Sequence, residues 1–307
     1  MPLLPTSCQL CPRCCGANRD AGKRGVCGAD DSLVVARAAL HLWEEPCISA
    51  GAGSGTVFFA HCPLKCSYCQ NAPLAHEGQG VAITVERLAH IFLELQSQDA
   101  ANINLVTPTH YAPQIIEAVA QARALGLTVP VVYNTSGYEL ASAIRTLQGT
   151  VDVFLTDFKY WRSDESDAAK RYSQAPDYFD VAVPALDAML ECAGRLTMGN
   201  EGRWYALKQG VLVRHMMMPG RLEESKRIVA FLWERYGQRV LYSIMSQYTP
   251  VRHVDGCPEL DERVPADEYE QLLDYADSLG MENYYWQQGG AAKESFIPAW
   301  DGQGVLG

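Results

Sequence analysis

The stretch HCPLKCSYCQN, residues 61–71, carries three cysteines with the spacing C-x3-C-x2-C directly after a short apolar segment. Three thiolates on one tight loop can hold three irons of a cubane cluster, because iron–sulfur clusters favour cysteine thiolate ligands. The loop holds no fourth cysteine, which leaves one iron open for a substrate. A structural zinc site usually completes four protein ligands, so zinc fits this spacing poorly. The stretch therefore predicts a [4Fe–4S] site at Cys62, Cys66 and Cys69.

Outward from this loop, short apolar segments alternate with amphipathic ones along the chain. Six apolar segments are predicted to be buried parallel strands: Thr56–Ala60, Asn102–Val106, Pro130–Asn134, Val151–Asp157, Gly210–Met217 and Val240–Met245. Helices are predicted at Thr84–Gln98, Ala112–Leu125, Glu139–Leu147, Tyr178–Glu191, Leu222–Tyr236 and Pro265–Leu279. This alternation implies a parallel sheet with right-handed crossovers, either open or curved into a partial barrel. Function is then expected at the carboxyl ends of the strands.

The bulk composition is that of a globular protein. Hydrophobic residues make up 48% of the 307 residues and charged residues 20%, and this length suffices for one large α/β barrel. No apolar window reaches membrane-spanning length and no signal peptide is recognisable, so we expect a cytoplasmic protein without a membrane partner. The formal net charge of −11 argues against nucleic acid as a general partner, since phosphate binding needs a positive surface.

A second group of cysteines lies near the start of the chain. The chain has 11 cysteines, and an odd total without a secretion signal argues for metal or redox use rather than disulfides. Cys8, Cys11, Cys15 and Cys27 have the spacing C-x2-C-x3-C-x11-C, which suits an all-thiolate metal site. Zinc and a second iron–sulfur cluster both fit four thiolates, and reduced cysteines that only pack are the alternative. We expect residues 1–50 to form a cysteine-rich N-terminal metal-binding cap.

With Tyr68 as its aromatic residue, the cysteine loop has the form C-x3-C-x-aromatic-C, and the chain resembles the radical SAM superfamily. It looks most like the branch related to pyruvate formate-lyase activating enzymes, through the segments CPRCCGANR (11–19), GKRGVCG (22–28), HLWEEPCIS (41–49), GSGTVFFAHCPLKCSYCQN (53–71), NINLVTPTH (102–110), VVYNTSGYE (131–139), DVFLTDFKY (152–160), VRHMMMPG (213–220) and IMSQYTP (244–250). The resemblance implies a partial (βα)6 TIM-like barrel with a C-terminal extension over residues 51–307, and the cysteine-rich cap before it.

The resemblance also implies an oxidoreductase chemistry. A reduced [4Fe–4S] cluster would cleave S-adenosylmethionine, bound at the open iron, into methionine and a 5′-deoxyadenosyl radical. The related activating enzymes use this radical to make a glycyl radical on a partner protein, with a reducing protein such as flavodoxin or ferredoxin as electron source. Radical modification of a small molecule or peptide stays an alternative, and a non-catalytic metal-binding scaffold is a third.

Polar residues follow the expected strands, where the resemblance places contacts to S-adenosylmethionine. Thr107 and Thr109 stand where activating enzymes carry a glycine-glycine-glutamate segment that holds the amino group, although a plain strand-to-helix turn is the alternative. Asn134 and Ser136 replace an aspartate and an asparagine of the activating enzymes. They suit ribose hydroxyls or substrate, and the alternative is a turn built from turn-prone residues.

Charged residues follow the fourth and fifth expected strands. Asp157 and Lys159 alternate along one strand and therefore share a face, where they could grip a zwitterion or form a structural ion pair. Arg214 has the fork geometry of a carboxylate ligand, with a structural salt bridge as the alternative. Tyr68 can pack beside the cluster or an adenine ring. Gln247 follows the sixth strand, where the resemblance places cofactor or substrate contacts.

Overall fold

The structure is a computed structural model, and it describes residues 4–201, 204–287 and 298–306. Its strands are β1 Leu33–His41, β2 Ser54–Phe59, β3 Val81–Ile83, β4 Ile103–Val106, β5 Val131–Thr135, β6 Val153–Asp157, β7 Thr197–Glu201, β8 Trp204–Met216, β9 Leu241–Met245 and β10 Tyr284–Trp286. Its helices are α1 Pro46–Ser49, α2 Ala72–Ala75, α3 Val85–Ser97, α4 Ala112–Ala124, α5 Ala141–Arg145, α6 Ala168–Ser173, α7 Tyr178–Ala193, α8 Leu222–Tyr236 and α9 Ala266–Ser278. Short 3-10 turns lie at η1 Arg19–Ala21, η2 Thr109–Tyr111, η3 Gly237–Arg239 and η4 Pro258–Asp261.

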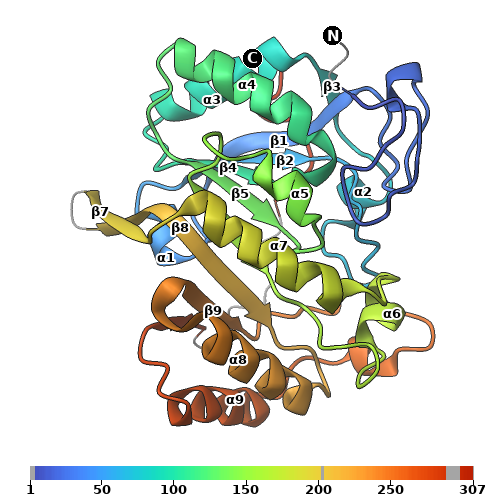
Figure 1. Cartoon of the computed structure of the whole chain (residues 1–307), viewed down its shortest axis with the longest axis vertical. Helices are drawn as coiled ribbons and strands as arrows, with labels where there is room; N and C mark the ends of the chain where they lie inside the picture. Colours follow the sequence, from blue (N-terminus) through green and yellow to red (C-terminus); the bar gives the residue numbers. More distant parts are fainter. Residues whose placement is uncertain (1–3, 202–203, 288–297, 307) are drawn as a thin grey trace.

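The strands of the described chain pair in the order β10-β9-β8-β6-β5-β4-β2-β1-β3, and β7 pairs with β8. From β2 to β9, each neighbouring pair along this order is parallel, and these six strands overlap the six that the sequence predicts. Helices α3, α4, α5, α7 and α8 lie on one side of the curved sheet (Figure 1). The expected partial (βα)6 barrel is therefore confirmed.

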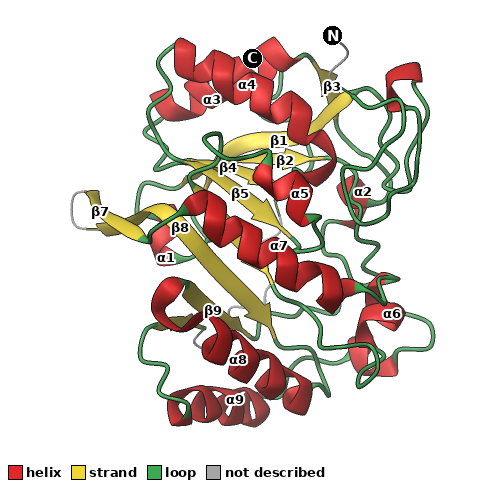
Figure 2. Cartoon of the chain, in the orientation of Figure 1, coloured by secondary structure: helices red, strands yellow, loops and turns green. Residues whose placement is uncertain are grey.

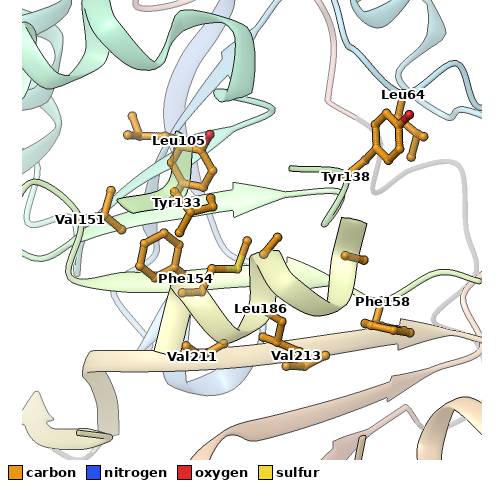
Figure 3. Close-up of a cluster of buried hydrophobic side chains, with 14 of the residues drawn as sticks. Leu64, Leu105, Tyr133, Tyr138, Val151, Phe154, Phe158, Leu186, Val211 and Val213 are labelled. Carbon is orange, nitrogen blue, oxygen red and sulfur yellow. The ribbon is translucent and has the colours of Figure 1, made fainter. Parts of the chain in front are cut away.

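The core lies between the sheet and these helices because each helix has one apolar face. In α7, Leu186 is buried and faces Phe154 of β6 and the β8 residues Val211 and Val213 (Figure 3). Helix α3 begins after Thr84, whose hydroxyl accepts a hydrogen bond over 3.1 Å from the amide of the third residue of the helix. Among the described helices, none is long and apolar enough to cross a membrane.

Strand β1 is the main feature that the sequence analysis did not predict. It lies inside the segment assigned to the cap, yet it pairs antiparallel with β2 and, on its other side, with β3. Its alternate residues Leu33 and Val35 are fully buried, which is the pattern of a strand against a core. Before β1, residues 4–32 of the cap consist of loops around η1, and after β1 the cap continues into α1 (Figure 2). The division of the chain at residue 50 stays a prediction.

Candidate functional site

The predicted cluster loop follows β2, at the carboxyl edge of the parallel strands. The amides of Leu64 and Asn71 face the sulfurs of Cys62 and Cys69. Burial raises the pKa of the Cys62 and Cys69 thiols, and these amides oppose part of the rise. The third sulfur, that of Cys66, accepts a hydrogen bond from a hydroxyl group of α6. The loop therefore holds three adjacent thiols at the carboxyl edge of the sheet.

Helix α6 fixes this loop from the outside. The Ser67 amide donates to the carbonyl of Tyr172 over 2.7 Å, and the Ser173 hydroxyl donates to Cys66 Sγ over 3.0 Å. The hydroxyl of Tyr160 lies 2.6 Å from that of Ser173 and extends the chain of hydrogen bonds away from the sulfur. The helix thus positions both the backbone and one candidate ligand of the loop.

A cavity of about 530 Å³ opens beside the loop and reaches into the barrel. The cavity is lined by eight of the residues that the sequence analysis selected: Cys66, Tyr68, Cys69, Asn134, Asp157, Lys159, Arg214 and Gln247. They come from the loop and from the ends of β5, β6, β8 and β9, which converge because parallel strands share one carboxyl edge. The cavity therefore brings candidate metal ligands together with both signs of charge.

Four charged side chains form a connected network at the cavity wall. Asp157 accepts from Lys159 Nζ at 2.7 Å and from Arg214 Nε at 2.9 Å. The same guanidinium reaches Glu44 at 3.3 Å and donates to the Asn134 amide oxygen at 2.8 Å. Just after β5, the chain passes very close to the end of β6, and Gly137 makes this possible. A Cβ at this position would lie only 2.2 Å from a backbone oxygen.

The pKa values of the two acids in this network are shifted in opposite directions. Burial raises the pKa of Glu44, and Arg214 opposes the rise only in part. Burial acts on Asp157 as well, but Arg214 and Lys159 outweigh it and hold the pKa of this carboxyl below its usual range. Asp157 is therefore a fixed anion that orients two cations, whereas Glu44 is the group of the cavity wall that can take up a proton.

Three predicted cofactor residues lie outside the cavity lining. Thr107 has φ of 59°, a left-handed conformation that is strained for a β-branched residue, and it turns the chain at the end of β4. Beyond this turn, the Thr109 hydroxyl is buried and donates to Glu139 over 2.6 Å. The half-buried Ser136 uses its carbonyl to accept from Tyr178. Thr109 is thus part of a buried network around Glu139, whose pKa burial raises to about 7.

Glu44 is the main site residue that sequence reasoning did not select. It lies between β1 and α1, outside the alternating strand pattern, and accepts from the amides of Asn104 at 3.1 Å and Asn134 at 3.3 Å. His41 and Trp43 of the same segment also line the cavity. The usable signal was a pair of acids inside the otherwise apolar run HLWEEP, just before a proline that begins a helix.

The four predicted cap cysteines lie close together beside the cluster loop. Cys8, Cys11 and Cys27 are buried and Cys15 is half-buried, and all are reduced. Throughout the described residues, no three histidine, cysteine, aspartate or glutamate side chains are placed as ligands of one ion. That finding covers the cluster loop and the cap alike. In the cluster loop, the donor set of three adjacent cysteines with hydrogen-bonded sulfurs fits an iron–sulfur cluster, whose irons each take a separate thiolate.

Comparisons with known proteins agree with this arrangement. Residues 50–174 match the family described as 4Fe-4S single cluster domain, a span that contains the cluster loop. The chain is 26% identical over 289 residues to Uncharacterized protein MJ0674 of Methanocaldococcus jannaschii, with 91% of this chain and 77% of that protein covered. Its structure is similar to that of Streptococcus suis SuiB bound to precursor peptide SuiA, with a TM-score of 0.50 and 12% identity. That match covers 75% of this chain, which spans 47% of the SuiB chain.

The likeness to SuiB shows the fold, and the match over residues 50–174 supports an iron–sulfur cluster at the loop. Both agree with the barrel and the cysteine loop that the sequence predicts.

Proposed function

We propose that this protein is a radical SAM enzyme in which Cys62, Cys66 and Cys69 hold a [4Fe–4S] cluster. The observation that carries the proposal is the loop itself: three adjacent thiols after β2, of which Cys66 accepts a hydrogen bond from Ser173, and two of which line a charged cavity. When bound and reduced, such a cluster would supply the electron that cleaves S-adenosylmethionine to methionine and a 5′-deoxyadenosyl radical. The cysteines are therefore assigned as metal ligands of the catalytic centre.

The residues of the cavity would bind and orient the two other participants. With its amino and carboxylate groups at the open iron, S-adenosylmethionine would keep amine N–H groups that Asp157 can accept and a second carboxylate oxygen for Lys159 or Arg214. Asn134 and Gln247 add amide groups that can bind ribose or substrate hydroxyls. Tyr68, buried beside the loop, offers a ring face for adenine.

Two substrate classes follow from the site. The resemblance to activating enzymes supports a glycyl-radical protein as the partner. Radical modification of a peptide or small molecule is the second candidate. SuiB, which shares the fold, is bound to a precursor peptide in its structure, which agrees with a peptide substrate.

Further partners belong to the proposal. A reducing protein such as flavodoxin or ferredoxin would supply the electron. With a formal charge of −11, nucleic acid is not among the proposed partners.

The test is S-adenosylmethionine cleavage by the anaerobically reconstituted, dithionite-reduced protein, with 5′-deoxyadenosine followed by chromatography. We expect product from the wild type and from Cys192→Ala, a half-buried cysteine on α7 that serves as the matched control. Cys66→Ala should give none. Equal product from Cys66→Ala and the wild type would refute the assignment of the loop.

A further inference from the structure

We propose that Cys8, Cys11, Cys15 and Cys27 bind a second thiolate-ligated metal centre, separate from the catalytic cluster and present as zinc or as an iron–sulfur cluster. This goes beyond S-adenosylmethionine cleavage, since none of the four cysteines lines the catalytic cavity. The matched iron–sulfur family begins at residue 50 and so leaves the cap unassigned.

The four thiols lie close together inside the cap. Cys8, Cys11 and Cys27 are only 5 to 6% exposed. A Cβ placed on Gly25 would lie 3.3 Å from the sulfur of Cys15 and equally far from that of Cys27, so these two sulfurs flank one point of the backbone. The side chain of Cys8 lies within hydrogen-bond reach of the Cys15 sulfur. Residues that are 19 positions apart in the chain are thus brought together by their sulfurs.

The cap backbone turns amides toward three of these sulfurs. In each case the amide belongs to the residue two positions further on: Arg13 for Cys11, Ala17 for Cys15 and Ala29 for Cys27. The same spacing occurs at Cys62 and Cys69 in the loop assigned to the catalytic cluster. The cap therefore repeats the local geometry of the chain's other thiol site.

Cys14 is a cap cysteine that lies outside the proposed metal site. It is exposed, it has φ of 38°, and its thiol donates to the carbonyl of Cys11 over 3.4 Å. The chain thus turns one cysteine out of the group, although its neighbour Cys15 points in. Cys14 therefore serves as the control among the cap cysteines.

A metal would also supply what the cap otherwise lacks. In the described residues 4–32, the turn η1 is the only helix or strand, and the rest of the segment is held by turns and loops. Metal binding can provide the folding free energy of such small loop-rich units. The cap rests on the catalytic loop, because Lys65 donates to the Cys27 carbonyl over 3.1 Å and Arg13 to the Pro63 carbonyl over 3.0 Å.

The experiment uses the full chain in a Cys62→Ala/Cys66→Ala/Cys69→Ala background, purified anaerobically. Removing the catalytic ligands ensures that any retained metal belongs elsewhere, so this result and that of the cleavage assay are independent. Iron, zinc and acid-labile sulfide are measured per chain. Iron with sulfide would identify a second iron–sulfur cluster, and about one zinc would identify a zinc site.

Two further variants locate the metal. Adding Cys11→Ser and Cys15→Ser should remove at least nine-tenths of the retained metal, whereas adding Cys14→Ser should leave it in place. A background protein without bound metal, or equal metal after the Cys11 and Cys15 changes, would overturn the proposal. Should the background protein be insoluble, metal counting on the wild type decides: no iron or zinc beyond one [4Fe–4S] cluster per chain would overturn it as well.

Discussion

Among individual residues, Ser173 has a defined effect on the proposed cluster. Its hydroxyl donates to Cys66 Sγ, and Tyr160 and Tyr68 continue the chain of hydroxyls at 2.6 and 2.9 Å. Hydrogen bonds to the ligand sulfurs help to set the reduction potential of an iron–sulfur cluster. Because the reduced cluster carries more negative charge, a donor at the sulfur stabilises it. Ser173 therefore makes the cluster easier to reduce.

Ser173→Ala should lower the midpoint potential of the cluster. One hydrogen bond contributes about 1 kcal/mol, which corresponds to roughly 40 mV for one electron. An EPR-monitored redox titration measures the shift. The control is Ser67→Ala, because the Ser67 hydroxyl is buried and has no hydrogen-bond partner among the described residues. Equal potentials for Ser173→Ala and the wild type would contradict this role.

Single residues could be placed from the sequence where the strand pattern applies. Alternation put Asp157 and Lys159 on one face, and the structure joins them in an ion pair. Thr109 was placed beside the cofactor by position in the motif, but the left-handed turn at Thr107 carries its side chain toward Glu139 instead. Glu44 could not be placed, because a residue between elements has no periodicity that fixes its direction.

Among the elements, the cap, the cluster loop and α6 meet at one side chain. The Arg13 guanidinium donates to the carbonyls of Pro63 in the loop and of Ser173 and Gln174 at the end of α6. It also lies 5.0 Å from the ring centre of Tyr138. One fork of donors thus holds three segments that are far apart in the chain.

Arg13→Ala should loosen this junction. Hydrogen bonds from a charged group contribute about 2 kcal/mol each, so we expect the free energy of unfolding to fall by at least that amount. Hydrogen exchange of the Ser67 amide, which bonds to α6, should become faster. Arg24→Ala is the control, since Arg24 lies in the same cap but is 74% exposed and makes one ion pair with Asp30. Unchanged exchange at Ser67 in Arg13→Ala would refute the junction.

Elements were predictable where burial on both faces gives a continuous apolar run, as in the six parallel strands. The other strands were not predicted, for different reasons. Strand β1 carries an apolar run but lies within the segment assigned to the cap, β3 has three residues, and β7 and β10 are short partners at the margins of the sheet. Short strands form because a neighbour offers free backbone groups, and this cannot be read from their own sequence.

At the scale of the whole molecule, the fold brings two thiol sites to the carboxyl edge of one barrel. The cap loops lie beside α2, which follows the cluster loop (Figure 1). The cluster loop lies between the cap and the cavity, bonded to the cap through Lys65 and lining the cavity through Cys66 and Cys69. This order places the proposed cluster where its open iron can face a ligand in the cavity.

The most direct test of the account is the EPR spectrum of the reduced protein with and without S-adenosylmethionine. If three cysteines leave one iron open toward the cavity, the amino and carboxylate groups of S-adenosylmethionine bind that iron and change the signal of the reduced cluster. We expect this change in the wild type, and no cluster signal from the catalytic site in Cys66→Ala. A reduced cluster whose spectrum is identical with and without saturating S-adenosylmethionine would contradict the account.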